Sequence, residues 1–348
     1  MSQKKLFVLI LAVAAALSAA FVVYAQAPQG QAPAQGQRGD GQGRGARGEG
    51  RGRGGDAQRG GDARGGQAGG QRAAAPPQPM AIKQIKPGLY MVTGNGGNST
   101  VRVTDQGVIL VDTKNLGDQF YNELVALIKT VSPQPVKYAF ATHVHQDHSG
   151  NMGRFVKAGA QVITHEGLKR NLEVGGADGK GYTSNAGKPE PPNLTYGKNK
   201  KIKLGNARAE AYHYASGHTG GDTIVYFPDV KVVSLGDEFT AAGPNCDYPM
   251  GGSILDWSKS LANVLKLNFD TAIPGHGNDP LTKADVITFQ KRMDAIGKKA
   301  VELAKKGTPK EKIRAEIQAQ VDMGNWQMAN VVNDQRLDLF YDEVSKAK

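Results

Sequence analysis

The sequence predicts a mixed α/β fold (α+β in some schemes) that ends in a helical extension. Between residues 80 and 282, short apolar runs bounded by Gly, Asn and Asp alternate with stretches of helical periodicity, which is the pattern of an α/β protein. Hydrophobic residues make up 39% of the 348 residues, which allows a sizeable core and excludes a wholly disordered chain. Residues 283–348 read as helical, so we expect a C-terminal helical extension there.

Five strands and one helix are expected in the first part of this region. Sequences rich in Gly and Asn, such as the one between Gly94 and Gly97, mark turns between the first strands. A helix is expected from about Gly117 to Thr130, because apolar residues recur there at helical spacing. The expected strands are Gly88–Gly94, Ser99–Val103, Gly107–Asp112, Val136–Thr142 and Gln161–Thr164.

The second part repeats the alternation and then becomes helical. Helices are expected at Leu255–Leu267, after a capping-box sequence at Thr282–Asp285, and after Thr308-Pro309. The face of the helix that follows the capping box is formed by Val286, Phe289, Met293 and Ile296. The expected strands are Ile202–Leu204, Arg208–Tyr214, Thr223–Phe227, Val230–Leu235 and Thr271–Pro274.

Residues 1–25 have the features of a secretory signal peptide. Lys4 and Lys5 precede an uncharged run from Leu6 to Val23, and small residues around Ala25 provide a cleavage site. An uncleaved membrane anchor is the alternative, because 18 apolar residues reach spanning length. We therefore expect a periplasmic or secreted protein, with an inner-membrane-anchored form as the alternative and membrane contact only in that case.

Residues 26–79 read as a disordered linker rich in Gly, Arg and Gln. The segment holds 17 of the 46 glycines and no aromatic residue, so it cannot bury enough apolar surface to fold. It also holds eight Arg against four acidic residues, and so contributes much of the net charge of +11. The charge is therefore weak support for a nucleic-acid partner, and we expect a small-molecule substrate and no specific nucleic acid. The oligomeric state stays open.

A cluster of potential metal ligands follows the expected strand Val136–Thr142. His143, His145, Asp147 and His148 lie within six positions. His143 and His145 are two residues apart, so an extended backbone would point both imidazoles the same way. Imidazole and carboxylate groups are the ligands that zinc prefers, and the cluster therefore predicts a metal site.

Three other segments place a similar side chain after an apolar strand. They contain His218 in Gly-His-Thr, Asp237 in Gly-Asp and His276 in Pro-Gly-His-Gly. Each is a weak signal alone, because a histidine beside glycine in a loop is usually structural. Together they indicate a cleft where strand ends converge, which is where α/β sheets bind their ligands.

The order of these motifs, HxHxDH, GHT, GD and PGHG, resembles the metallo-β-lactamase superfamily of binuclear metallohydrolases. The resemblance covers roughly Met80 to Pro280 and implies a four-layer αβ/βα sandwich over residues 80–282. It implies two metal ions, expected to be zinc, with iron or manganese as alternatives. The first ion would be bound by His143, His145 and His218, the second by Asp147, His148 and His276, and Asp237 would bridge them.

The aspartate at position 237 is informative about the subfamily. One group of zinc β-lactamases has a cysteine at this step, whereas glyoxalase II-type thioesterases, lactonases and other members have an aspartate. The sequence is therefore nearer the bridging-aspartate members. Cys246, the only cysteine, is expected not to be a ligand, and a lone cysteine excludes both a disulfide framework and a thiolate-built zinc site.

The resemblance implies hydrolysis by a hydroxide that bridges two zinc ions. The hydroxide would attack an ester, lactone, thioester or amide bond, and Asp147 would help to orient it. Three alternatives stay open on the same fold: β-lactamase activity on β-lactam antibiotics, an iron-dependent oxidoreductase, and an accessory protein of a periplasmic oxidation pathway. The substrate pocket is expected to depend on the loops Gly175–Asn193 and Ala241–Gly252.

Four further residues deserve assignment near this site. Asp112 matches a strand-end acid of the family and is expected to support the site rather than to act in catalysis. His165 is expected to be a packed histidine, while His213 could face the pocket or point elsewhere. Asp222 is expected to orient His218 from behind, because metal-bound histidines usually have such partners.

Overall fold

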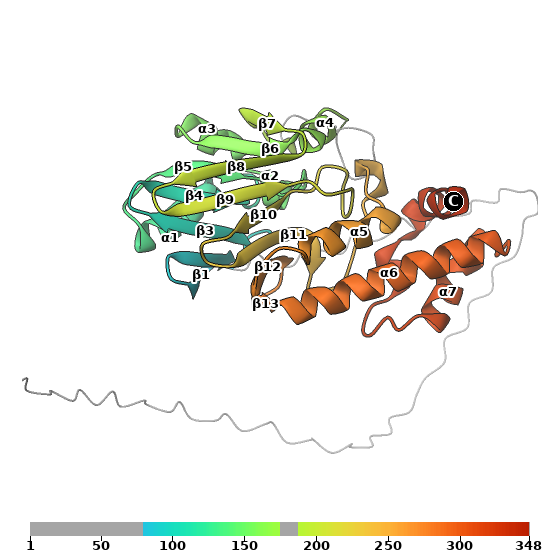
Figure 1. Ribbon diagram of the computed structural model, residues 1–348. Coiled ribbons are helices and arrows are strands. Elements are labelled where there is room, and N and C mark those ends of the chain that lie inside the picture. Colours follow the sequence, from blue (N-terminus) through green and yellow to red (C-terminus); the bar gives the residue numbers. More distant parts are fainter. Residues whose placement is uncertain (1–78, 175–186, 348) are drawn as a thin grey trace, which may run out of the picture. The chain divides into compact units, whose positions relative to one another are not determined.

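The computed structural model describes residues 79–174 and 187–347 (Figure 1). The expected signal peptide lies outside the described residues, as do nearly all of the expected linker and residues 175–186 of the expected substrate loop. Among the described helices, none is both long enough and apolar enough to cross a membrane.

The first sheet has seven strands that lie side by side in chain order. Strands β1 to β4 form an antiparallel meander, and β4 to β7 run parallel. A parallel connection needs a crossover, and helix α1 (Asp118–Val131) provides it between β4 and β5. The strands are β1 (Ala81–Lys86), β2 (Leu89–Thr93), β3 (Ser99–Thr104), β4 (Gly107–Val111), β5 (Val136–Phe140), β6 (Gln161–His165) and β7 (Leu194–Tyr196).

The second sheet has six strands in the order β13-β12-β11-β10-β9-β8. Only β11 and β12 are parallel, and helix α5 (Ile254–Val264) lies between them in the chain. The strands are β8 (Asn199–Leu204), β9 (Ala207–Tyr212), β10 (Ile224–Phe227), β11 (Val232–Thr240), β12 (Thr271–His276) and β13 (Leu281–Thr282).

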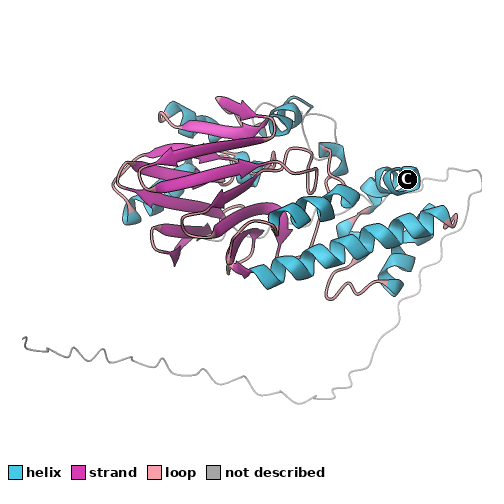
Figure 2. Cartoon of the chain, in the orientation of Figure 1, coloured by secondary structure: helices cyan, strands magenta, loops and turns pink. Residues whose placement is uncertain are grey.

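The two sheets face each other across a shared apolar core, and helices cover their outer faces (Figure 2). Leu89, Ile109 and Phe140 of the first sheet belong to one buried cluster with Val225 and Phe227 of the second. A second cluster joins the outer face of the first sheet to α1 and to the short helices α3 (Met152–Lys157) and α4 (Glu166–Val174). The predicted four-layer αβ/βα sandwich is confirmed.

The C-terminal helices pack on the outer face of the second sheet. Helix α6 (Lys283–Lys305) begins at the expected capping box, where Thr282 and Asp285 bond each other's backbone N–H. Its expected apolar face is buried, and it shares one core with Trp257 and Leu261 of α5. The helices that follow are α7 (Lys310–Gln320), α8 (Met328–Val331), a 3-10 turn at Asp334–Arg336, and α9 (Leu337–Lys346).

The structure also corrects two expectations about individual elements. Strand β1 was not expected, because AIKQIK lacks a regular alternation of apolar and polar residues. The strand expected at Val230–Leu235 continues to Thr240, so Asp237 lies inside β11 rather than after its end. The register of β11 against β12 shifts around Gly236, whose φ is 53°, and this irregularity turns Asp237 towards the site.

Candidate metal centre

Seven predicted ligand side chains meet where strands of both sheets end. His143 and His145 follow β5, and Asp147 and His148 lie on the short helix α2 (Gln146–Ser149). The other three come from the second sheet: His218 from the β9–β10 loop, Asp237 from β11 and His276 from the last position of β12. Their donor atoms form two compact groups, which are the two ligand sets implied by the resemblance. Their roles as ligands stay a prediction.

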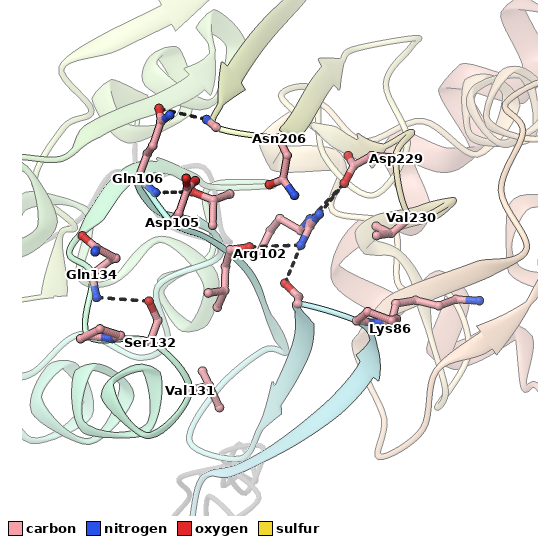
Figure 3. Close-up of a pocket in the computed structure, with 16 residues that line it drawn as sticks. Lys86, Arg102, Asp105, Gln106, Val131, Ser132, Gln134, Asn206, Asp229 and Val230 are labelled. Atoms are coloured by element: carbon pink, nitrogen blue, oxygen red, sulfur yellow. Dashed lines mark hydrogen bonds and ion pairs between the residues drawn. The ribbon is translucent and has the colours of Figure 1, made fainter. Parts of the chain in front are cut away.

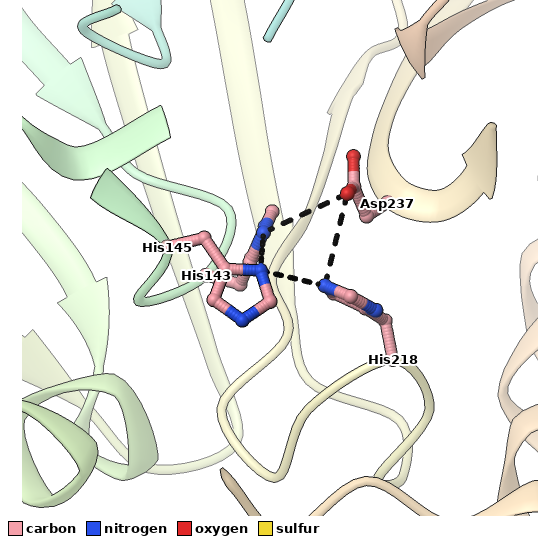
Figure 4. A group of neighbouring side chains, drawn as sticks. All are labelled: His143, His145, His218 and Asp237. Carbon is pink, nitrogen blue, oxygen red and sulfur yellow. Dashed lines mark hydrogen bonds and ion pairs between the residues drawn. The ribbon is translucent and has the colours of Figure 1, made fainter. Parts of the chain in front are cut away.

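The first ligand group consists of His143, His145, His218 and Asp237 (Figure 4). The Nδ1 atom of His145 lies 3.1 Å from Nε2 of His143 and 2.9 Å from Nε2 of His218. Oδ2 of Asp237 lies 3.9 Å from Nε2 of His143 and 3.7 Å from Nε2 of His218. The four contacts form a closed ring, and its ligand atoms all lie within 4.8 Å of one another.

The second ligand group consists of Asp147, His148 and His276. Nε2 of His276 lies 3.1 Å from Oδ2 of Asp147 and 3.2 Å from Nε2 of His148. The other oxygen of Asp237, Oδ1, lies 3.2 Å from Nε2 of His148 and 3.5 Å from Nε2 of His276. Asp237 therefore presents one carboxylate oxygen to each group.

These distances fit two metal ions that share Asp237. A zinc ion with bonds of about 2.0–2.1 Å separates neighbouring ligand atoms by about 3.3 Å, and the contacts of 2.9–3.9 Å in the two groups lie on either side of this value. Asp237 Oδ1 is buried and has no hydrogen-bond partner among the described residues, which is costly unless a cation compensates it. The donor set of imidazoles and carboxylates is the set that zinc prefers.

Hydrogen bonds fix the ring orientation of His143 and His148. Oγ1 of Thr142 lies 3.1 Å from Nδ1 of His143, and Oδ2 of Asp112 lies 2.8 Å from Nδ1 of His148. Asp112 also accepts hydrogen bonds from the backbone N–H and the hydroxyl of Thr142. An acceptor at Nδ1 keeps the proton there and leaves Nε2 free to bind metal. Asp112 therefore supports the site, as expected.

The partners of His145 and His218 were not found from the sequence. Nε2 of His145 lies 2.7 Å from Oδ2 of Asp247, a fully buried carboxylate 102 residues away in the chain. Nδ1 of His218 donates to the backbone carbonyl of Asn245 at 2.6 Å. The expectation that Asp222 orients His218 is therefore wrong. Asp222 instead accepts from the backbone N–H and hydroxyl of Thr219, and so stabilises the turn that carries His218.

The protonation states of most ligands suit a cation. Burial, followed by repulsion from neighbouring imidazoles, lowers the pKa of His143 well below its usual range and lowers the pKa of His218 to about 4. Burial raises the pKa of Asp147 and of Asp237, but the charge of His148 together with the contacts of neighbouring imidazoles outweighs it, and both pKa values fall below the usual range. Neutral imidazoles and ionised carboxylates are the forms that bind metal.

The pKa of His148 is shifted in the opposite direction from that of His143 and His218. Burial lowers its pKa, but Asp147, Asp237 and Asp112 all face the ring and together raise its pKa well above the usual range. Three carboxylates around one imidazole form a strongly negative position. A dication there would take over the charge that the second proton of His148 otherwise supplies.

The β2–β3 hairpin closes over the second ligand group. The backbone N–H of Gly97 donates to the carbonyl of Asp147 at 3.0 Å, and a Cβ at Gly97 would lie 2.1 Å from the ring of His148. Only glycine fits there. The buried Lys114 holds the hairpin through hydrogen bonds from Nζ to the carbonyls of Val92 and Gly97, at 2.8 and 2.7 Å. Sequence reasoning missed Lys114, because a lysine after a strand reads as exposed.

His165, His213 and Cys246 lie outside both ligand groups. The rings of His165 and His213 stack on each other with centroids 3.8 Å apart, and Nδ1 of His213 donates to the carbonyl of Asp222. His165 is thus a packed histidine, as expected. Cys246 is fully buried, and its Sγ lies 3.8 Å from the carbonyl of Gly217.

A large cavity of about 1080 Å³ lies away from the ligand groups, between the β1–β2 turn and the β10–β11 turn (Figure 3). Its central charged side chain, Arg102, forms a 2.6 Å ion pair with Asp229 and donates to the carbonyls of Gly88 and Val103. The guanidinium is engaged on all sides, and none of the seven predicted ligands lines the cavity. We therefore place the candidate functional site at the two ligand groups and not at this cavity.

A four-layer sandwich with paired His/Asp groups at its strand ends defines a class of metal-dependent enzymes. The profile described as the metallo-beta-lactamase superfamily matches residues 92–276, which include all seven predicted ligands. The chain belongs to this superfamily, and the match supports a metal-dependent hydrolase, as the motifs implied.

Relatives with different names share this similarity. A "Metallo-beta-lactamase type 2" of Bacillus cereus is 27% identical over 213 residues, covering 57% of this chain and 77% of the relative. The "2,4-dinitroanisole O-demethylase subunit alpha" of Nocardioides sp. (strain JS1661) is 24% identical over 199 residues, covering 57% of each chain.

Solved structures share the fold at lower identity. The DIM-1 metallo-beta-lactamase superposes with a TM-score of 0.52 at 19% identity, covering 63% of this chain and 98% of its own. The sec-alkylsulfatase Pisa1 from Pseudomonas sp. superposes with a TM-score of 0.58 at 21% identity, covering 77% of this chain and 50% of its own.

Proposed function

We propose that the chain is an exported binuclear zinc hydrolase that cleaves an ester, lactone, thioester or amide bond. The observation that carries the proposal is the position of Asp237, whose two oxygens face two separate groups of ligand atoms. A carboxylate in this position holds two dications close together. The export signal expected in residues 1–25 supports a periplasmic or secreted location.

The residues would hold the two ions in different environments. His143, His145, His218 and Asp237 would hold the first, and Asp147, His148 and His276 the second. When bound, such ions supply Lewis acidity and lower the pKa of water to about 7. The side chains of Asp147 and His276 are 31% and 41% exposed, whereas those of His143 and His148 are buried. The substrate therefore approaches from the side of Asp147, where this carboxylate can orient the attacking water.

The second candidate function is β-lactam hydrolysis, which the name of the Bacillus cereus relative favours. Asp237 argues for the other hydrolases, because the chain offers no thiolate at this step and its single cysteine is buried outside both ligand groups. The demethylase and alkylsulfatase names of other similar proteins show how widely the reactions vary on this fold.

Metal analysis followed by a substrate panel tests the proposal. Protein purified without chelators is expected to contain about two zinc ions per chain. It should hydrolyse at least one member of a panel of esters, lactones, thioesters and amides, and lose this activity on chelation. A single iron without zinc would favour the oxidoreductase alternative, and turnover of β-lactams alone would favour the lactamase.

A further inference from the structure

The loop that orients the first ligand group rests on the C-terminal helical segment. This ligand-orienting loop, Asn245–Ser253, wraps around the turn that carries His218: the backbone N–H of Asp247 donates to the carbonyl of His218 at 2.8 Å. Its Asn245 carbonyl bonds His218 and its Asp247 carboxylate bonds His145. The loop thus sets the orientation of two of the three imidazoles in the first group.

Arg336, at the start of α9, holds the beginning of this loop. The side chain is buried, and its Nη1 donates to the side-chain oxygen of Asn245 and, at 2.9 Å, to the carbonyl of Cys246. Nη2 lies 3.4 Å from Oδ1 of Asp247. One planar guanidinium therefore contacts three consecutive residues, a geometry that its fixed fork allows and a lysine cannot reproduce.

The charge of Arg336 also matters for Asp247. Asp247 is fully buried, its Oδ2 bonds His145, and no hydrogen bond reaches its Oδ1 among the described residues. The guanidinium at 3.4 Å is therefore the cation that compensates this oxygen. Removing the guanidinium would leave a carboxylate buried without adequate compensation, and the carboxylate would move from its present position. Such a movement disturbs its bond to His145.

The far end of the same loop is also held by α9. Glu343 accepts hydrogen bonds from the hydroxyl of Tyr248, at 2.5 Å, and from the hydroxyl of Ser253. Arg336 directly precedes α9 and Glu343 lies on it, about two helical turns further on, so both ends of the loop are held by the short segment from Arg336 to Glu343. Arg336 lies 60 residues after His276, the last residue of the family match.

We propose that Arg336 is a positioning residue for the first metal ion, acting through Asp247 on His145 and through Asn245 on His218. The C-terminal helical segment is thereby part of the scaffold of the metal centre. The proposal rests on the proposed binuclear site, because it concerns the ligands of that site.

The test compares Arg336→Met with Arg314→Met in the full chain. Arg314 is a matched control: it lies on α7, donates to the carbonyl of Val332 at 3.0 Å and pairs with Asp334, and among the described residues no hydrogen bond or ion pair joins it to the ligand-orienting loop. Zinc affinity is measured by competition with a chromophoric chelator. Arg336→Met is expected to lower the binding affinity of one of the two zinc ions by about 10–100-fold, which is the range measured when hydrogen-bond partners of metal ligands are lost. Arg314→Met should bind both ions as the wild type does.

A spectroscopic readout on the metal-free protein separates positioning from general stability. The ring N–H protons of His145 and His218 are bonded to Asp247 and to the carbonyl of Asn245, so both should give protected imidazole signals by NMR. Arg336→Met should lose both signals, whereas Arg314→Met should keep them. If Arg336→Met fails to fold, Arg336→Lys carries the test, because it keeps the charge but cannot contact three residues at once.

A double-mutant cycle with Asp247→Asn gives the decisive comparison. If Arg336 acts through Asp247, its replacement should cost much less zinc affinity in the Asp247→Asn background than in the wild type. Wild-type zinc affinity in Arg336→Met or Arg336→Lys overturns the proposal, and so does an equal loss in Arg314→Met. A wild-type chain that binds no metal would instead overturn the proposed function.

Discussion

The two ligand groups contain the same kinds of side chain, but different parts of the chain support them. The second group is held by Asp112, which directly follows β4, and by the β2–β3 hairpin. Lys114 stabilises this hairpin through hydrogen bonds to two of its carbonyls. All of these residues lie within the family match. The first group is held by Asn245 and Asp247, and these depend on Arg336, which lies after the match.

The difference shows that similar metal chemistry can be supported by local or by distant contacts. Asp112 reaches His148 across 36 positions, and it does so with a left-handed backbone, φ 64°, at a point where the chain turns sharply. Asp247 reaches His145 across 102 positions and needs a third segment to compensate its charge. We therefore expect the first group to be the more sensitive to changes far from the metal centre.

Replacing Asp237, the carboxylate that faces both ligand groups, should weaken metal binding without being specific to one group. Asp237→Ala deletes the carboxylate that faces both, so the repulsion between two dications is no longer offset and at least one ion should bind more weakly. We expect a loss of at least about 10–100-fold in affinity, since partners outside the coordination sphere already contribute that much. Zinc content after dialysis measures it. Retention of two ions would contradict the bridging role of Asp237.

Replacing Asp112 should weaken binding of the second ion more than binding of the first, because Asp112 bonds His148 directly but reaches His143 only through the hydroxyl of Thr142. Asp112→Asn keeps the shape and tolerates the left-handed backbone, but its amide has a donor where the carboxylate has an acceptor. If that donor faces Nδ1 of His148, the ring must move its proton to Nε2, the atom needed for metal. We expect about 10–100-fold weaker binding of one ion. Asp112→Asn and Arg336→Met should then have their larger effects on different ions, as a two-step zinc titration would show. If both variants mainly lost the same ion, the idea that different parts of the chain support the two ligand groups would be wrong.

Most of the fold and the grouping of the predicted ligand side chains could be predicted because their signals are local. The pattern of short strands and the first histidine motif depend on spacings of a few residues, and the structure places His143 and His145 in one group and His148 in the other, as the resemblance implied. The strand expected from the sequence ends at Leu235, five residues before β11 does, because Asp237 and Glu238 interrupt the apolar run. An irregular strand that contains a buried carboxylate lacks the apolar pattern by which a strand is predicted.

The supports of the metal centre could not be predicted because they depend on tertiary contacts. Lys114 and Arg336 are buried, although charged residues of this kind are mostly exposed. Nothing near either residue in the sequence indicates its carbonyl or carboxylate partners. Asp222 misled the prediction because its position four residues after His218 suggested a local partner, while the actual partner is a backbone carbonyl, which any residue could provide.

Lys114, which supports the second group, should make the free energy of unfolding depend on pH between about pH 7 and 9.5. Burial lowers the pKa of Lys114 to about 7, and the nearby Asp112 opposes this shift without cancelling it. An unfolded lysine keeps its proton up to about pH 10.4, so the unfolded chain binds more protons across this range, and the free energy of unfolding should rise with pH.

Thermal unfolding of the metal-free protein in chelator tests this dependence. Lys114→Met should remove most of the rise, whereas Lys83→Met, which changes a side chain that is 58% exposed, should leave it in place. Equal slopes in the wild type and Lys114→Met would show that Lys114 stays charged in the folded protein. The hairpin over His148 would then be held by an ammonium group, and not by a neutral amine.

The smallest effect is expected for Cys246, which lies inside the ligand-orienting loop without facing a ligand group. Its Sγ is fully buried, 3.8 Å from the carbonyl of Gly217, and burial raises the pKa of the thiol well above its usual range, which disfavours the thiolate that would bind metal. Cys246→Ser leaves the backbone contacts of the loop with Arg336 and Val331 intact. The free energy of unfolding should fall by about 1–3 kcal/mol, because a hydroxyl is buried with a poor partner. Zinc content and affinity should stay at wild-type values. If Cys246→Ser loses zinc while Asp237→Ala keeps both ions, the thiol is a ligand after a rearrangement of the loop, and the cysteine-type lactamase site replaces the aspartate-bridged one.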